Sequence, residues 1–175
     1  MQLSIVAKTL GLLLMVFSLA QVPPVLVDLI YSEGEYLTFV FSFILTVFGG
    51  LALWWPFRAI KKSFRLREGV LIVVSFWIVL SLFGMLPFLI TESISNLSFS
   101  NAFFESMSGL TTTGATVLSQ LDDLPKSILF YRQQLQWLGG MGIIVLAVAV
   151  LPLLGVGGME LYHAESSGIA KDRLT

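Results

Sequence analysis

Cysteine is missing from this 175-residue sequence, histidine occurs once, and charged residues make up only 12% of the chain. Without cysteine there is no disulfide, no thiolate metal site and no cysteine nucleophile. The single histidine, His163, excludes the clustered imidazoles that zinc and non-haem iron usually require. A formal net charge of -1 offers no cationic surface for nucleic-acid phosphates, so no nucleic-acid partner is expected.

The sequence is rich in long apolar runs. Hydrophobic residues account for 56% of the chain and its mean hydropathy is +0.89, whereas soluble domains average about 45–50% apolar and about 25% charged residues. A bilayer core of about 30 Å is crossed by about 20 apolar residues in a helix. Four windows of this kind contain no Asp, Glu, Lys or Arg: residues 9–27, 37–57, 69–91 and 133–159. The sequence therefore predicts an all-α, multi-pass membrane protein.

Charge beside these windows predicts how the chain crosses the membrane. Residues 58–68 contain five Lys or Arg side chains and one Glu, which by the positive-inside bias places this loop in the cytoplasm. The loop at residues 31–36 is acidic and is expected outside, so both termini are expected in the cytoplasm. We interpret the basic loop as a topological anchor in membrane lipid rather than as a specific docking site.

Residues 92–132 are too polar for a further span, and their first half is too apolar for a solvated loop. Within them, residues 99–110 place apolar side chains at helical spacing, with Ser98, Ser100 or Asn101 available as N-cap and Gly109 as a natural stop. About ten residues suit a re-entrant helix that enters the membrane without crossing it. We expect its C-terminus to point into the membrane.

The residues that follow, 111–116, read Thr-Thr-Thr-Gly-Ala-Thr and are expected to be extended. Non-helical backbone at membrane depth is tolerated where protein buries it or where it lines a water-filled path. Carbonyls on such a path replace the water shell of K⁺ without introducing charge. Gly114 is placed to adopt the positive φ that turns successive carbonyls the same way, and the negative end of the short helix dipole adds a modest favourable field.

A Thr-Gly run in isolation is also typical of a simple turn. Its context is what favours an ion pathway, because the order is span, polar break, short amphipathic helix, Thr-Gly segment and span. Two longer motifs extend this context: FFESMSGLTTTGAT at residues 103–116 and RQQLQWLGGMG at residues 132–142. With these motifs, and with residues 151–165, the chain resembles the N-terminal portion of TrkH-type potassium uptake proteins in the Trk/Ktr/HKT superfamily.

This resemblance implies four covalently linked helix–pore-helix–helix repeats around one pore, preceded by two additional helices. Residues 1–68 then correspond to two leading transmembrane helices and the basic cytoplasmic loop. Residues 69–159 correspond to the first pore repeat, with a pore helix at 99–110, a filter at 111–116 and a helix at 133–159. Residues 160–175 form a cytoplasmic segment that leads to the missing repeats.

The resemblance also implies a site, carried over by motif position. The expected K⁺ ligands are the backbone carbonyls of Thr112, Thr113, Gly114 and Ala115, with Thr111 and Glu105 as candidate support. K⁺ is the transported ligand, no organic cofactor is expected, and the superfamily members that favour Na⁺ often carry Ser where this chain has Gly114. The implied partners are the three remaining repeats, on the same longer chain or as copies of this one, together with a second copy of the full protein and a cytosolic nucleotide-binding regulatory subunit. The implied location is the bacterial inner membrane.

Other interpretations stay open on the sequence. A truncated fragment or a non-conducting membrane scaffold is consistent with a chain that supplies one quarter of a pore. An intramembrane serine hydrolase built on Ser106 and Ser108 with His163 as base fits badly, because the orientation places His163 on the opposite side of the membrane.

Two features of the pore region have alternative roles. Glu105 either attracts cations or pairs with Arg132 or nearby backbone amides as scaffold. Gly139 and Gly140 are expected to permit close helix approach.

Overall fold

The structure is a computed structural model that describes residues 3–60, 66–94 and 96–153. These residues form helices and connecting loops, and no strand occurs among them. The chain up to Gly140 belongs to one compact unit, and the residues from Met141 onward belong to a second, whose described part is the end of the last helix. The predicted cytoplasmic segment 160–175, with His163, lies outside the described residues.

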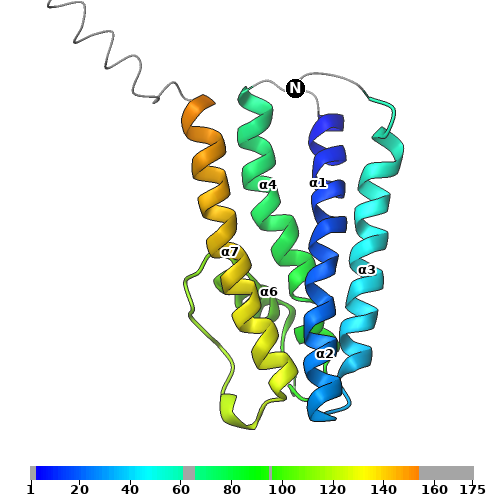
Figure 1. Cartoon of the computed structure of the whole chain (residues 1–175), viewed down its shortest axis with the longest axis vertical. Helices are drawn as coiled ribbons and strands as arrows, with labels where there is room; N and C mark the ends of the chain where they lie inside the picture. Colours follow the sequence, from blue (N-terminus) through cyan, green and yellow to red (C-terminus); the bar gives the residue numbers. More distant parts are fainter. Residues whose placement is uncertain (1–2, 61–65, 95, 154–175) are drawn as a thin grey trace, which may run out of the picture. The chain divides into compact units, whose positions relative to one another are not determined.

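Seven α-helices follow one another along the described chain. They are α1 (Leu3–Ser18), α2 (Val22–Tyr31), α3 (Tyr36–Trp54), α4 (Leu66–Gly84), α5 (Leu86–Ile90), α6 (Phe99–Leu110) and α7 (Lys126–Leu153), with short 3-10 turns η1 (Leu19–Gln21), η2 (Trp55–Phe57) and η3 (Leu121–Asp123). Figure 1 shows α1, α3 and α4 running side by side, whereas α6 is shorter. The all-α prediction is confirmed for the part of the chain that is described.

Three helical stretches of the described residues are long and apolar enough to cross a membrane: Leu3–Tyr31, Tyr36–Phe57 and Leu71–Ile90. They overlap the first three predicted windows, so the chain is a multi-pass membrane protein. The fourth predicted window, residues 133–159, falls on α7 as far as Leu153 and is not among these three stretches. Its last residues lie outside the described part, and the fourth span stays a prediction.

Proline explains why the helix is interrupted within the stretches Leu3–Tyr31 and Leu71–Ile90. Pro23 lies in the first turn of α2, and Pro87 lies in the first turn of α5. Proline has no N–H to donate and fits best in a first helical turn, so the chain passes through η1 before α2 and through Met85 before α5. The second break is short, because the Met85 N–H still donates to the Ser81 carbonyl at 3.0 Å.

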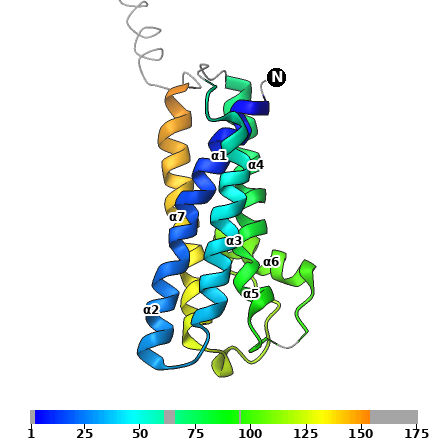
Figure 2. The same cartoon turned by 90° about the vertical axis from the view of Figure 1, so that its right-hand side faces the viewer.

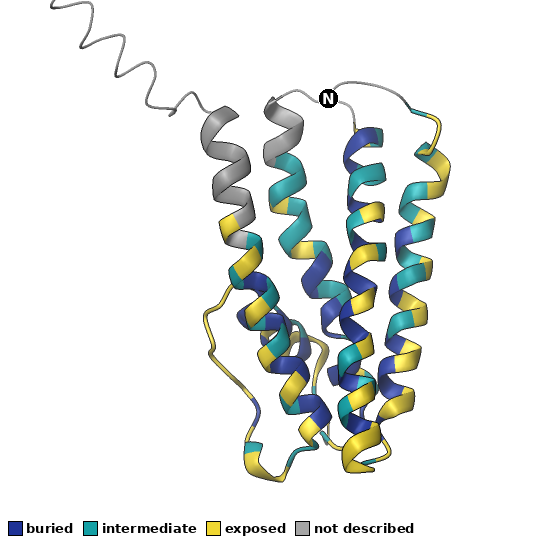
Figure 3. Cartoon of the chain, viewed as in Figure 1, coloured by how far each residue is buried: buried dark blue, intermediate teal, exposed yellow. Residues whose placement is uncertain are grey.

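Helices α1 and α3 pack closely through small residues. A Cβ added at Gly11 would lie 2.6 Å from the carbonyl oxygen of Gly50, and a Cβ at Gly50 would lie 2.9 Å from that of Gly11. Small residues let helix backbones approach where lipid offers no hydrophobic drive for association. Many of the outward positions of these helices are exposed, as Figure 3 shows, and they are largely apolar. The two leading helices therefore form a tight pair with a lipid-compatible outer face.

A buried tyrosine joins this pair to the remaining helices. Tyr131 of α7 is fully buried, and its ring packs against Phe39 of α3 and Phe88 of α5 at centroid distances of 5.7 and 5.5 Å. Its hydroxyl donates to the Gly84 carbonyl at 2.9 Å and accepts from Gln21 Nε2 at 3.2 Å. Satisfying this hydroxyl avoids the cost of an unpaired polar group in an apolar interior, so one side chain ties five elements together.

Candidate cation-binding segment

Helix α6 has the bounds that the sequence predicts, residues 99–110, and it lies next to α5 (Figure 2). Ser98 is the N-cap, since its side chain accepts from the Asn101 N–H at 3.2 Å. The helix ends at Leu110, one residue after Gly109, the expected stop. Gly109 lies inside α6, where its small size admits Leu135 of α7, whose Cβ would be 3.1 Å from a Cβ at Gly109.

Helix α6 ends within the unit, against the middle of α7. Its last residue, Leu110, lies so close to Gly139 of α7 that a Cβ at Gly139 would overlap the Leu110 carbonyl. At about 1.5 Å per residue, Gly139 is about 20 Å along α7 from Lys126. For comparison, a bilayer core is about 30 Å thick. The residues after Leu110 therefore begin well inside the helix bundle, far from the start of α7.

Backbone hydrogen bonds orient the residues that follow α6. The N–H of Thr112 donates to the Gly109 carbonyl at 2.9 Å, and the N–H groups of Thr113 and Gly114 donate to the Ser108 carbonyl at 3.0 and 3.3 Å. In a planar trans peptide the C=O points opposite to the N–H of the next residue. The carbonyls of Thr111, Thr112 and Thr113 therefore point away from α6, toward the exposed side of the segment.

Two left-handed residues shape this segment. Gly114 has φ +74°, as the sequence predicts, and Thr112 has φ +58°, which the sequence did not indicate. A positive φ is a marked departure for a β-branched residue and costs about 1–2 kcal/mol. No sequence signal could have identified it, because threonine is an unfavourable choice there. The expected simple extension of residues 111–116 is therefore an irregular turn followed by backbone that is neither helix nor strand.

Ala115 differs from the other predicted ligands. Its carbonyl accepts a hydrogen bond from Ser108 Oγ at 2.7 Å and so faces α6. The threonine hydroxyls are also engaged, since Thr111 Oγ1 donates to the Met107 carbonyl at 2.8 Å and lies 2.9 Å from Thr113 Oγ1. Residues 111–117 are all exposed along one side. The arrangement offers backbone oxygens, rather than charged side chains, to a ligand on that side.

Glu105 lies behind the segment and is buried. Its Oε1 accepts from Arg132 Nε at 2.6 Å, and the Thr116 hydroxyl lies 3.0 Å from each carboxylate oxygen. The N–H of Val117 donates to Oε2 at 3.1 Å. Of the two roles open on the sequence, the structure shows the pairing with Arg132, and it adds backbone and hydroxyl partners from the segment itself.

The acidic loop between α2 and α3 has contacts that the sequence did not reveal. Glu33 accepts from the N–H groups of Lys126 and Ser127 at 2.7 and 3.0 Å, so it caps the start of α7. A carboxylate at a helix N-terminus satisfies free N–H groups and complements the helix dipole. Glu35 accepts from the hydroxyls of Thr38 and Thr91, each at 2.8 Å. The loop thus holds the start of α7 and the end of α5.

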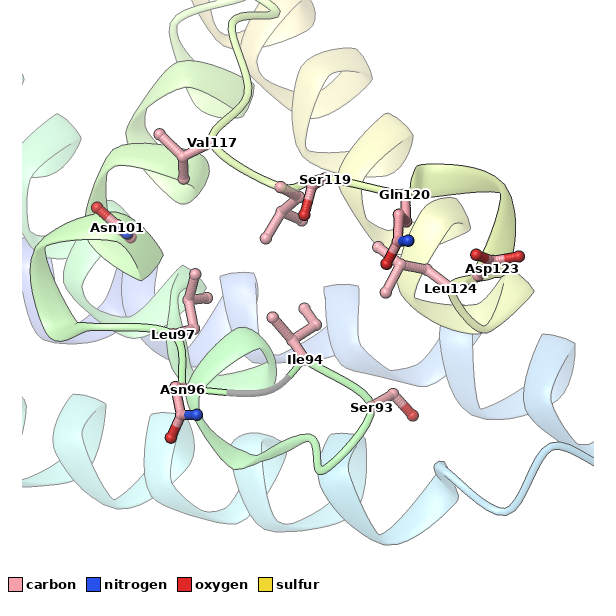
Figure 4. A pocket seen from close by; sticks show the side chains of 11 residues that line it. Ser93, Ile94, Asn96, Leu97, Asn101, Val117, Ser119, Gln120, Asp123 and Leu124 are labelled. Carbon is pink, nitrogen blue, oxygen red and sulfur yellow. The ribbon is translucent and has the colours of Figure 1, made fainter.

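A polar hollow lies beyond the segment, where Val117 leads into residues 118–124. It has a volume of about 330 Å³, and its lining includes Asn96, Asn101, Ser119, Gln120 and Asp123. Figure 4 shows these side chains around the opening, from the loop before α6, from α6 itself and from the loop before α7. The lining also contains apolar side chains, and it meets the chain at Val117, directly after the candidate segment.

The described residues show no pairing of a serine with a base that would support the serine hydrolase interpretation. Ser108 donates its hydroxyl hydrogen to the Ala115 carbonyl, so its oxygen is engaged in holding the segment. Ser106 is fully buried. The expected base, His163, lies outside the described residues.

Comparison with known proteins agrees with this arrangement. The family described as "TrkH: Cation transport protein" matches residues 36–174. The chain is 54% identical over 172 residues to the Trk system potassium uptake protein TrkH of Halomonas elongata, covering 98% of this chain and 36% of that protein. It is 56% identical over 167 residues to the protein of the same name from Escherichia coli K12, covering 95% of this chain and 34% of that protein.

A solved structure is also similar, the crystal structure of the potassium transporter TrkH from Vibrio parahaemolyticus. The TM-score is 0.84 at 53% sequence identity, and the match covers 96% of this chain and 36% of the other. The chain thus spans about a third of the length of these relatives. Family match, identity and fold agree, and they identify a family of transporters rather than enzymes. The chain belongs to the TrkH family of cation transport proteins.

Proposed function

We propose that this chain supplies the first of four pore repeats of a potassium uptake protein, with residues 69–159 as the repeat. K⁺ is the proposed cargo, and Thr112, Thr113 and Gly114 are its proposed ligands, with Thr111 next to them. Ala115 belongs to the same segment, but its carbonyl is engaged by Ser108. The observation that carries the proposal is the set of N–H bonds that turn the carbonyls of Thr111 to Thr113 away from α6.

Carbonyl oxygens in this orientation suit a monovalent cation. They replace part of its water shell and add no charge that would hold the ion too tightly to leave. The C-terminal end of α6, which carries the negative end of the helix dipole, lies directly beneath the segment and adds a favourable field. The names of the relatives, which are potassium uptake proteins, support K⁺ as the ion.

One repeat supplies one of the four carbonyl rows that enclose an ion, so we expect no uptake by this chain alone. Residues 1–175 would be expressed in a strain that lacks its own potassium uptake, beside the same residues joined to the remaining repeats of the Vibrio parahaemolyticus relative. The joined protein should restore growth at limiting K⁺, and the chain alone should not. Growth with the chain alone would show that four copies assemble into a pore.

A silent joined protein would favour the scaffold alternative, provided that it reaches the membrane in normal amounts. Rb⁺ flux into liposomes that contain the purified joined protein then separates the two. Flux supports a conducting repeat, and its absence supports a non-conducting scaffold.

We also propose that both termini are cytoplasmic, in a bacterial inner membrane. Lys8 Nζ donates to the carbonyls of Arg58 and Ile60 at 3.0 and 2.8 Å, which places the start of α1 and the end of α3 at the same end of the unit. The Arg58 guanidinium lies 4.3 Å from the centre of the Trp55 ring, and such cation–aromatic pairs suit a membrane interface. Glu33 and Glu35, which bind the start of α7 and the end of α5, lie at the opposite end of the unit.

Single cysteines test this orientation in a chain that has none. Ser32 and Ser119, both exposed, are expected outside, and Ala59, also exposed, is expected inside. With intact cells and an impermeant thiol reagent, Ser32→Cys and Ser119→Cys should label, and Ala59→Cys should label only after the membrane is opened. The parent chain controls for background. The reverse pattern would overturn the orientation.

The proposed partners follow from the family. They are three further repeats on a longer chain, a second copy of the full protein, and a cytosolic nucleotide-binding regulatory subunit. The basic cytoplasmic loop and residues 160–175 are the parts of this chain that would face such a subunit. Co-purification of the subunit with the full-length protein, and its loss when residues 160–175 are replaced by a neutral linker, would support this assignment.

A further inference from the structure

The carboxylate of Glu105 is paired with Arg132 and also accepts hydrogen bonds from two further residues. The two side chains are 2% and 9% exposed and lie 2.6 Å apart. The gap around them, lined by Gly109, Ala115 and Gln136, is too small for a water molecule. Burying two charges is costly unless their geometry is good and further hydrogen bonds satisfy them. Here the further donors are the Thr116 hydroxyl and the Val117 N–H, both in or next to the candidate filter.

Building on the proposed function, we propose that Glu105 is a positioning residue that ties the outer end of segment 111–116 to α6 and α7 and thereby sets its preference for K⁺ over Na⁺. It does this through Arg132, Thr116 and Val117. Glu105 does not act as a bare charge that gathers cations, because its carboxylate is neutralised at contact distance.

Hydrogen bonds hold the segment at both of its ends. Its inner end is fixed by the N–H groups that donate to the Ser108 and Gly109 carbonyls, and Ala115 is bound by Ser108 Oγ. Between these points Gly114 has open space, since the nearest atom to a Cβ there would be Gln136 Nε2 at 3.7 Å. The outer end is held by the carboxylate of Glu105. A carbonyl can be aimed steadily only when the backbone on both sides of it is fixed, so both attachments matter.

Arg132 connects this attachment to α7. Its guanidinium group is rigid and planar, so it fixes the carboxylate in one orientation. Leu135 and Gly139, on the same helix, already contact α6 at Gly109 and Leu110. The filter segment is thus held against one rigid wall made by α6 and α7. Removing the carboxylate would release its outer end while leaving the inner attachments intact.

Four variants in the complete four-repeat protein proposed above test this assignment. Glu105→Gln keeps the shape of the side chain but loses the charge. Thr116→Val removes only the hydroxyl that bonds to the carboxylate, and Thr116→Ser restores it. Glu92→Gln is the matched control, because Glu92 is an exposed acid at the same end of the unit. The measurements are Rb⁺ uptake with competing Na⁺, and the apparent KM for Rb⁺ at low and high ionic strength.

We expect Glu105→Gln to lower the preference for Rb⁺ over Na⁺ by about tenfold and Thr116→Val by about threefold, because the first weakens every hydrogen bond of the carboxylate and the second removes only the one from the Thr116 hydroxyl. Thr116→Ser and Glu92→Gln should keep the parental ratio. If Glu105→Gln instead raises only the KM, and high ionic strength removes the difference, Glu105 gathers cations and the inference is wrong.

A variant that does not fold and a parent protein that does not transport give outcomes different from a change in ion preference. If Glu105→Gln does not fold, Thr116→Val tests the positioning role, because it leaves the ion pair in place. An unchanged preference for Rb⁺ over Na⁺ in Thr116→Val then overturns the inference. A parent protein that takes up no Rb⁺ contradicts the proposed function and this inference with it. A parent that takes up Rb⁺ while Glu105→Gln and Thr116→Val both keep its ratio contradicts the positioning role alone.

Discussion

Replacement of Gly139 by alanine is expected to destabilise the protein by about 2 kcal/mol or more, because overpacked cores cost about 1–3 kcal/mol and sometimes more. The added Cβ would overlap the carbonyl oxygen of Leu110, the last residue of α6. A backbone atom cannot turn aside as the end of a flexible side chain can. Either α6 or α7 must move, and the segment that follows Leu110 must move with it. Transport should therefore fall together with stability.

Gly140 provides the matched control one position along α7. A Cβ there would lie 3.8 Å from Thr112 Cγ2, an ordinary contact. Alanine favours an α-helix over glycine by about 1 kcal/mol, so Gly140→Ala should be neutral or stabilising. Thermal unfolding in detergent and Rb⁺ uptake measure both effects. Equal melting temperatures for the two variants would show that the close approach of α6 and α7 is not needed.

Gly114→Ser is expected to reduce the preference for K⁺ over Na⁺ with little loss of folding. Space is not the reason, because the nearest atom to an added Cβ would be 3.7 Å away. The reason is the φ of +74°, which penalises an L side chain by about 1–2 kcal/mol. That penalty corresponds to a factor of about 5–30 in the population of the native backbone. The other backbone conformations turn a carbonyl away from the ion and admit Na⁺ more readily.

Thr113→Ser is the control for this prediction. It lies one position earlier, outside the left-handed region, and keeps a hydroxyl 2.9 Å from that of Thr111. Its ion preference should match the parent. Reversal potentials with K⁺ and Na⁺, or Rb⁺ uptake in competition, give the ratio for each variant. A parental ratio in Gly114→Ser together with a lost ratio in Thr113→Ser would contradict the role assigned to Gly114.

The local features of the pore region could be predicted because they depend on near neighbours. Apolar spacing and the N-cap at Ser98 give α6 its bounds, and the only glycine in segment 111–116 has the positive φ expected of it. Contacts with residues distant in sequence could not be predicted in the same way, because a neighbour in space decides them. Gly109 looks like a helix stop, yet its contact is Leu135 of α7, and α7 begins at Lys126 because Glu33 caps it.

The sequence by itself determined the solvent and the family of this protein. Apolar windows of this length without charge are typical of membrane spans, and two long motifs resemble those of TrkH-type proteins. Only the tertiary structure decided which way the backbone oxygens of segment 111–116 point and what holds them. It turned the carbonyls of Thr111 to Thr113 outward and the Ala115 carbonyl inward. It also brought Arg132 to Glu105 and Gly139, rather than Gly140, against Leu110. The physical reason is that composition and periodicity report the surroundings of a residue on average, whereas a hydrogen bond or a steric overlap depends on the position of one atom from a distant part of the chain.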